Sequence, residues 1–147
     1  MRRINRAADK ESVIEALTSG ERPIFSMNWS LLMFAAVLGF KHGRREKLKK
    51  SDQGKAIRPE QFKQDTCFEG VLNLMTLLEH EDEKLLVSNE ENDDKRVATF
   101  EEYANGGLSI LSEKLETSSF SLDSMISFIA EELFDGNASA DDIEIQI

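Results

Sequence analysis

Residues that small proteins use for covalent or metal cross-links are scarce in this chain. Of its 147 residues only one is cysteine, Cys67, and only two are histidine, His42 and His80. A single cysteine cannot form an internal disulfide, and Cys67 precedes Phe68 at the start of an apolar stretch, so we expect a reduced, buried thiol. The cysteine and histidines do not fall in C-x-x-C or H-E-x-x-H spacing. We therefore predict neither a metal site nor a cofactor.

Proline and aromatic residues are also rare, at 2 prolines and 7% aromatics. Apolar residues recur at steps of three and four rather than alternating, which is typical of helices and not of strands. The length suits one ordinary core. The sequence therefore predicts an all-α fold, a compact single-domain helical bundle of about five to six helices over residues 1–136. An acidic C-terminal tail over residues 137–147 is expected to follow it.

The chain lacks a long hydrophobic run. Its most apolar stretch, residues 27–40, contains Asn28 and Ser30 and is shorter than the ~20 apolar residues of a membrane-spanning helix. We expect this stretch to be the central buried helix. The basic start, MRRINRAADKES, has no apolar run behind it and does not resemble a signal peptide. We therefore expect a cytoplasmic protein with no membrane partner.

Sequence motifs for catalysis are absent as well. There is no GxxxxGK[ST] phosphate loop, no GxGxxG turn and no serine in a glycine elbow, so nucleotide hydrolysis, dinucleotide redox chemistry and serine hydrolysis lack their usual anchors. We predict no catalytic residue and a protein that is not an enzyme. An unrecognised active site around Glu101, Glu102 or Tyr103 is the third hypothesis for the function.

Charge is abundant but unevenly distributed. Residues 1–63 contain 14 Lys/Arg and 7 Asp/Glu, a net charge of +7, whereas residues 64–147 contain 4 and 21, a net charge of -17. The net charge of -10 therefore hides a dipolar chain. Such a distribution indicates a basic face for a polyanion and an acidic face for a basic partner, or halves that neutralise each other within one fold or between subunits.

The basic charge is concentrated in one run, FKHGRREKLKK at residues 40–50, which we expect to form a loop after the central helix. Gly39 and Gly43 permit the turn. Such a loop can lie along nucleic-acid phosphates, or it can dock on acidic segments of the chain such as residues 79–83 or 90–94. The residues predicted to bind nucleic acid are Lys41, Arg44, Arg45, Lys47, Lys49, Lys50, Lys55 and Arg58.

Three later segments carry helical patterns. Thr66 to Glu69 fits a capping box before one helix, and Ser121 can cap a last helix with an apolar face from Leu122 to Leu133. A long amphipathic helix from Asp93 is interrupted by two adjacent glycines, which indicates a kink or the close approach of another backbone. The residues predicted to serve partner binding or packing there are Tyr103, Asn105, Gly106 and Gly107.

Two segments of the chain resemble a known family. FAAVLGFKHGRREKL, with Ala36, Gly39, Gly43, Arg44 and Arg45, and FEEYANGGLSIL, with Glu102, Tyr103, Ala104, Gly106 and Gly107, are similar to DNA phosphorothioation-associated protein 4, also called Dnd system-associated protein 4. The resemblance extends from about Asp9 to about Leu115. Neither block is a catalytic signature.

The resemblance implies a bacterial accessory protein, encoded with genes that place sulfur in the DNA backbone or restrict DNA lacking it, in an antiphage defence role. Our hypothesis is a non-catalytic protein whose basic loop contacts DNA phosphates. Its acidic half would engage another protein of the modification and restriction system. The competing hypothesis is a protein-interaction or regulatory module that never touches DNA and that can self-associate as a homo-oligomer.

Overall fold

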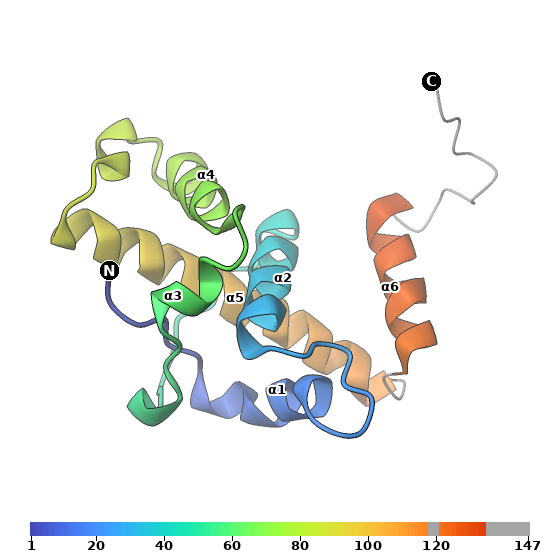
Figure 1. Ribbon diagram of the computed structural model, residues 1–147. Coiled ribbons are helices and arrows are strands. Elements are labelled where there is room, and N and C mark those ends of the chain that lie inside the picture. The colour runs from blue at the N-terminus through green and yellow to red at the C-terminus, as the bar shows by residue number, and fades with distance from the viewer. Residues whose placement is uncertain (118–120, 135–147) are drawn as a thin grey trace.

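The computed structural model describes residues 1–117 and 121–134, and within these ranges the regular elements are all helical (Figure 1). The prediction of an all-α fold is confirmed. The acidic tail predicted at residues 137–147 lies outside the described residues. Short 3-10 turns occur at Ala8–Lys10, Gln53–Lys55 and Glu83–Leu86. The α-helices are α1 (Glu11–Thr18), α2 (Asn28–Lys41), α3 (Pro59–Phe62), α4 (Phe68–His80), α5 (Glu90–Thr117) and α6 (Leu122–Phe134).

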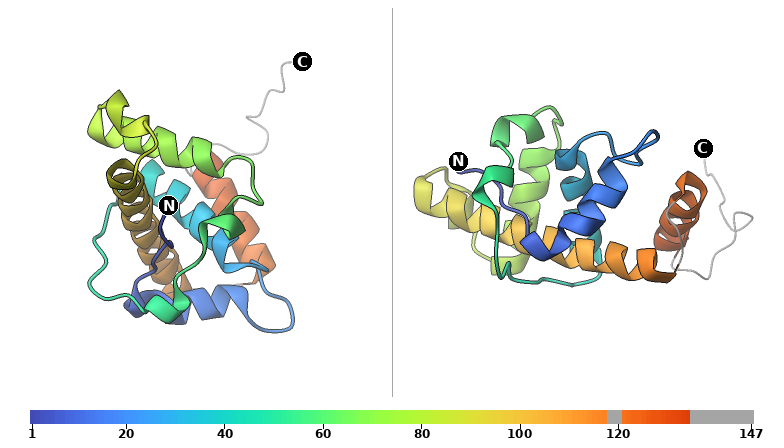
Figure 2. Two further views of the ribbon diagram at one scale, coloured as in Figure 1. Left: turned by 60° about the vertical axis from the view of Figure 1, so that its left-hand side comes forward. Right: turned by 90° about the horizontal axis from the view of Figure 1, so that it is seen from below.

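The long helix α5 is the axis on which the other helices are arranged. Helix α2 crosses α5 near its middle, α4 packs on the N-terminal half of α5, and α6 lies beyond α2 at the C-terminal end of α5 (Figures 1 and 2). Because α2 is apolar on almost every side, it needs neighbours all round. It is the central helix that the sequence predicts, and its buried residues are Leu31, Leu32, Met33, Ala35, Ala36, Leu38 and Gly39.

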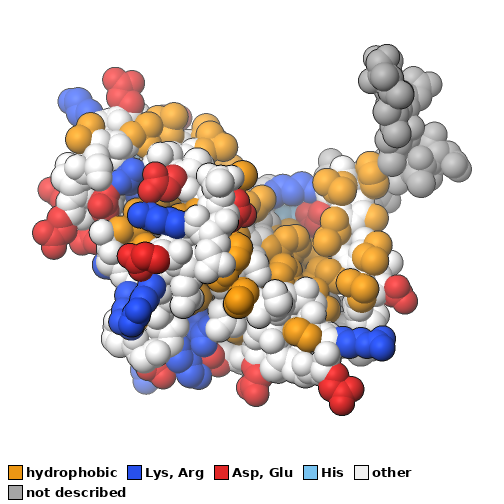
Figure 3. Space-filling model, in the orientation of Figure 1, with side chains coloured by type: hydrophobic (Ala, Val, Ile, Leu, Met, Phe, Trp, Pro, Cys, Tyr) orange, Lys and Arg blue, Asp and Glu red, His pale blue; other side chains and the backbone are white. Residues whose placement is uncertain are grey.

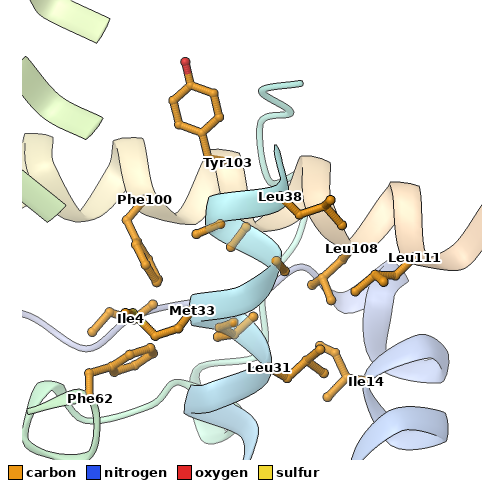
Figure 4. Close-up of a cluster of buried hydrophobic side chains, with 14 of the residues drawn as sticks. Ile4, Ile14, Leu31, Met33, Leu38, Phe62, Phe100, Tyr103, Leu108 and Leu111 are labelled. Carbon is orange, nitrogen blue, oxygen red and sulfur yellow. The ribbon is translucent and has the colours of Figure 1, made fainter. Parts of the chain in front are cut away.

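Aromatic side chains fill the core on the α4 side of α2. Phe62 stacks on Phe68 with ring centroids 4.8 Å apart, and Phe100 meets both rings edge-on at 5.7 and 5.6 Å. These edge-to-face arrangements suit the ring quadrupoles. Ile4, from the N-terminal segment, is fully buried in the same cluster (Figure 4). The N-terminus is thereby tied to the core.

Small residues bring the backbones of α2 and α5 together. A Cβ atom added to Gly39 would overlap the carbonyl oxygen of Tyr103, and one added to Gly107 would overlap that of Ala35. Helix α5 continues through its glycines without a break in the helical assignment. Of the two alternatives from the sequence, close approach of another backbone is therefore the one observed.

Two local predictions are wrong. Cys67 is exposed rather than buried, because it precedes the first residue of α4 and only Phe68 turns into the core. The expected capping box is also absent: Cys67 is the N-cap of α4, and its amide donates to Asp65 Oδ1 at 2.8 Å. An aspartate turn thus begins this helix in place of a threonine cap.

Candidate nucleic-acid interface and the joint behind it

The basic run leaves α2 through a tight turn. Gly43 adopts a left-handed conformation with φ 62°, and the amide of Arg44 donates to the Gly39 carbonyl at 2.8 Å. This pattern is common where a glycine ends a helix. The run is therefore anchored at its start by the same end of α2 that packs on α5.

Beyond the turn, the chain lies along α5. The amide of Glu46 donates to the carbonyl of Glu102 at 3.0 Å. Asn105 is buried, and its side-chain amide donates to the carbonyls of Glu46 and Lys47 at 3.2 and 3.3 Å. Ser109 donates to Glu46 Oε1 at 2.8 Å. The segment is thus held along its backbone and does not hang free as a loop.

Arg44 is taken up by carboxylates of the protein itself. Its guanidinium donates to Glu113 in a bidentate pair at 2.7 and 3.0 Å, and its Nε donates to Glu46 at 2.7 Å. These hydrogen bonds raise the pKa of Arg44 further above its ordinary value, and the Arg44 partner lowers the pKa of Glu113. Planar, two-pronged donation of this kind is what arginine offers and lysine does not.

Arg45 is engaged by two further carboxylates, Glu79 from α4 and Glu102 from α5. Glu79 also accepts a hydrogen bond from the hydroxyl of Tyr103. Burial, and then this hydrogen bond, raise the pKa of Tyr103 to about 12, whereas the Tyr103 hydrogen bond is the largest cause that lowers the pKa of Glu79. The network joins α4, α5 and the basic run at one point.

Glycine permits this joint. A Cβ atom on Gly106 would overlap the carbonyl oxygen of Arg44, so no other residue allows the basic run to lie so close to α5. The four residues predicted for partner binding or packing thus all lie inside the molecule, where each meets α2, α4 or the basic run. We call this cluster the joint; it comprises Gly39, Arg44, Arg45, Glu46, Glu79, Glu102, Tyr103, Asn105, Gly106 and Gly107.

The remaining predicted nucleic-acid-binding residues fall into two groups. Lys41 turns toward α6 and pairs with Glu132 at 3.1 Å, and Lys55 pairs with Glu11 at 3.2 Å. The other four side chains are exposed, and among the residues that the structure describes they have no hydrogen-bond or ion-pair partner. These four are Lys47, Lys49, Lys50 and Arg58.

The exposed cations lie beside the N-terminal segment. Ile4 forms an antiparallel bridge with Ile57, so that Arg3 is the cross-strand neighbour of Arg58, and the amide of Ala8 donates to the Lys50 carbonyl at 2.8 Å. Arg3 is exposed and was not among the residues predicted from the sequence. The basic N-terminal sequence could have indicated Arg3, but only the bridge between Ile4 and Ile57 shows which residues lie beside it. We call Arg3, Lys47, Lys49, Lys50 and Arg58 the basic ledge.

Comparison with known proteins identifies the family. A family model described as DNA sulphur modification system-associated protein 4 matches residues 3–146, nearly the whole chain. The chain belongs to this family. No curated protein and no solved structure matches it significantly. Membership associates the chain with a DNA sulphur modification system, and other proteins of that system are its expected partners.

Both sequence blocks that carried the resemblance lie within the range matched by the family model, and in the structure they meet at the joint. The two histidines contact different side chains: His42 contacts Glu132 at 2.7 Å and His80 contacts Thr99 at 2.9 Å. Among residues 1–117 and 121–134 no three His, Cys, Asp or Glu side chains gather as metal ligands would. None of the helices described there is long and apolar enough to cross a membrane.

Proposed function

We propose that this chain is a non-catalytic accessory protein of a DNA sulphur modification system, and that it rests its basic ledge on DNA phosphates. The supporting observation is the set of exposed cations from two chain segments that meet without acidic partners in the described residues. Lysine and arginine at such a surface neutralise phosphates and release counterions. Contacts of this kind position a protein on a duplex but do not read its sequence.

The proposed DNA interface leaves out two arginines that the sequence predicted for it. Arg44 and Arg45 already bind carboxylates of the same chain, so bringing them to DNA would break the joint and leave four glutamates without these partners. The ledge instead uses the lysines of the same run together with Arg3 and Arg58. The acidic half of the molecule would face away from the duplex and meet a basic protein of the same system.

A non-catalytic role is part of the same proposal. The titratable groups that gather at the joint are taken up by one another, since Glu79 is held by Arg45 and Tyr103. A general base needs room for a substrate beside it. Glu79 is partly buried and already accepts from two donors of the same chain, so we assign the joint an architectural role and no reaction.

The test is fluorescence anisotropy of a labelled duplex with the purified protein at two salt concentrations. We compare the variant Lys49→Gln/Lys50→Gln with the matched variant Lys84→Gln/Lys95→Gln. The matched variant removes the same charge from the 3-10 turn after α4 and from α5. The ledge variant should weaken binding and reduce the slope of log K against log salt by about 1 for each phosphate that is no longer neutralised. The matched variant should bind as the unaltered protein does.

Equal binding by both variants, or no binding at low salt, would refute the ledge. Using phosphorothioated and unmodified duplexes in the same assay shows whether the protein distinguishes them. A difference would make the protein a sensor of the modification, and equal affinities would restrict it to backbone contact.

A second candidate function is a protein-interaction module that does not touch DNA. The observation that favours it is an exposed apolar surface between α2 and α6, which none of the ledge residues lines. This candidate would be favoured if the protein did not bind the duplex but did bind a protein partner at the surface between α2 and α6.

A further inference from the structure

Helix α6 has two apolar sides, and only one of them is buried. Met125 and Phe128 pack into the molecule, and the Lys114 ammonium lies 5.8 Å from the centre of the Phe128 ring. On the other side, Leu122, Ile126 and Leu133 remain 64%, 56% and 71% exposed. A surface helix normally turns its single apolar stripe inward. The second stripe of α6 is therefore unexplained by the fold.

The apolar residues on this side of α6 follow the spacing of a helix-pairing seam. Leu122, Ile126 and Leu133 are exposed, Ile129 between them is partly buried against the core, and the four residues are separated by four, three and four positions. This alternation brings side chains onto one line along a helix and is the pattern with which two helices pack knobs into holes. At 1.5 Å per residue the seam is about 17 Å long, which matches about three turns of a partner helix.

Helix α2 supplies the second wall of a groove. Val37, at 48% exposure, is the conspicuous surface residue of an otherwise buried helix, and it lines a hollow with Phe34 and Leu38 opposite Ile129 and Leu133. The hollow has a volume of about 330 Å³. Figure 3 shows hydrophobic side chains gathered along α6 and on the surface that it faces. We call this feature the α2/α6 groove.

Ion pairs hold the two walls together at one end of the groove. Lys41 Nζ lies 3.1 Å from Glu132 Oε2, and His42 Nε2 lies 2.7 Å from the same oxygen. Burial favours the neutral form of Glu132, but the hydrogen bonds from His42 and Lys41 outweigh it and lower its pKa. The groove thus has ion-paired side chains at this end and apolar side chains along its length. An amphipathic helix binds to a groove of this kind.

Charge indicates what kind of helix fits. Helix α6 contains three acidic residues, Asp123, Glu131 and Glu132, and no Lys/Arg. Glu132 is already paired with Lys41 and His42, and Glu131 with Lys114, whereas Asp123 is exposed beside the stripe with no cationic partner among the described residues. A second copy of α6 would add acidic residues and no cation to this surface, which is unfavourable. A helix with basic flanks would gain attraction at Asp123.

We infer that the α2/α6 groove binds an amphipathic helix of another protein, with apolar residues at heptad spacing and Lys/Arg on its flanks. The inference rests on the protein contact in the proposed function and is independent of the DNA contact. It identifies the surface that binds the partner, formed by α6 of the acidic half together with α2, and the chemistry that this surface recognises. Lysine and arginine stems can also cover apolar carbon at the rim while their charges reach the carboxylates.

The probe is a labelled synthetic helical peptide of about three to four turns with leucine at a and d positions and lysine at the flanks. Two comparison peptides are a scrambled sequence of the same composition and a version with glutamate in place of lysine. Fluorescence anisotropy with the full chain should give saturable binding of the first peptide only. Equal binding of the scrambled peptide would show attraction by net charge alone and would overturn the inference, and preference for the glutamate peptide would do the same.

Variants of the chain then locate the binding. Ile126→Gln/Leu133→Gln removes one exposed apolar side chain of the α6 stripe and one that also lines the groove, and Leu74→Gln/Val87→Gln removes two similarly exposed apolar residues elsewhere. The groove variant should raise the peptide Kd at least about ten-fold, whereas the matched variant should change it less than about two-fold. Circular dichroism and thermal unfolding confirm that both variants are folded. Weakened binding in the matched variant, or unchanged binding in the groove variant, would refute the groove.

Sedimentation of the full chain without peptide tests the other occupant. A monomer supports a partner from another protein, whereas a dimer that dissociates on Ile126→Gln/Leu133→Gln would assign the groove to a second copy and overturn the inference. The duplex assay separates this result from the proposed function. Groove variants should leave duplex binding unchanged, and the Lys49→Gln/Lys50→Gln variant should leave peptide binding unchanged.

Discussion

The two halves of the basic run behave differently although both are rich in cationic side chains. Arg44 and Arg45 point along the protein surface and bind carboxylates from α4, α5 and their own segment. Lys47, Lys49 and Lys50 follow directly and extend into solvent with no acidic partner in the described ranges. The cations of one short run therefore serve two purposes.

The side-chain chemistry explains the division. A guanidinium offers five donors in a plane and can bind two carboxylates at once, which suits a joint between helices. An ammonium is a compact, strongly hydrated charge on a flexible stem, which suits contacts with a mobile polyanion. The partners of each residue in a cluster of like charges must therefore be known before the cluster is called a binding site.

The largest effect on stability should come from adding a side chain where the backbones of α2 and α5 meet. Gly107→Ala would drive a Cβ atom into the Ala35 carbonyl and should reduce the free energy of unfolding by about 3 kcal/mol, the upper end of the usual cost of overpacking. Urea unfolding followed by the fluorescence of the single Trp29 measures it. Gly70→Ala is the control, because Gly70 in α4 has open space around it, and it should stabilise the chain by about 0.5–1 kcal/mol. Equal effects of the two substitutions would contradict close packing of α2 on α5.

Removing an arginine of the joint should have the next largest effect. Arg45→Gln leaves Glu79 and Glu102 without a shared cation and should cost about 1–2 kcal/mol, less than a fully buried pair because the side chain is one-third exposed. Lys95→Gln removes only an exposed pair with Glu91 and should cost about 0.5 kcal/mol or less. Urea unfolding compares the two variants. An Arg45→Gln variant of full stability with reduced duplex affinity would move Arg45 from the joint to the ledge.

The ionisation of Tyr103 reports on the joint directly. Tyr103 is the only tyrosine, so tyrosinate absorbance follows this one group, and the folded protein should titrate near pH 12 instead of the usual value of about 10. Because the pKa is higher in the folded state, the stabilisation is complete below pH 10 and is lost as pH rises through 12. Tyr103→Phe should abolish this alkaline loss. A midpoint near 10 in the folded protein would contradict both the burial of Tyr103 and its hydrogen bond to Glu79.

The smallest effect on stability should come from the lysine half. Lys49→Gln/Lys50→Gln removes exposed charges with no partner in the described structure, so the free energy of unfolding should change by less than about 0.5 kcal/mol. Thermal unfolding measures it beside Arg45→Gln. A larger decrease would mean that these lysines stabilise the fold, and the division between joint and ledge would fail.

The helices and the centre of the fold were predictable from the sequence. An all-round apolar stretch of this length indicates a buried helix, which is α2, and apolar residues at steps of three and four indicate α4 and α5. The adjacent Gly106 and Gly107 signalled a close contact, since two glycines in a helix cost stability that packing must offset. What the sequence could not show is which backbone makes the contact. That information depends on how α2 and its C-terminal turn lie across α5.

The partners of the charged residues were beyond sequence reasoning. The sequence left both fates of the basic run open, because Arg45 finds Glu79 and Glu102 at separations of 34 and 57 residues, and no local pattern encodes such pairs. At Cys67 the neighbouring apolar residues predicted a buried side chain, but the side chain is exposed. The stripe of α6 shows the same limit: periodicity reveals an apolar face but does not say whether the same chain covers it.

One long-range contact also bears on when the ledge can form. Arg2 donates two hydrogen bonds to Glu101, whose side chain also accepts from the amide of Asn5, across 99 and 96 residues of sequence. These bonds, with the Ile4 bridge to Ile57, hold Arg3 beside Arg58. During synthesis the N-terminal segment must therefore wait until Glu101 has left the ribosome. A nascent or truncated chain lacking α5 would carry the same basic residues without the surface that they build.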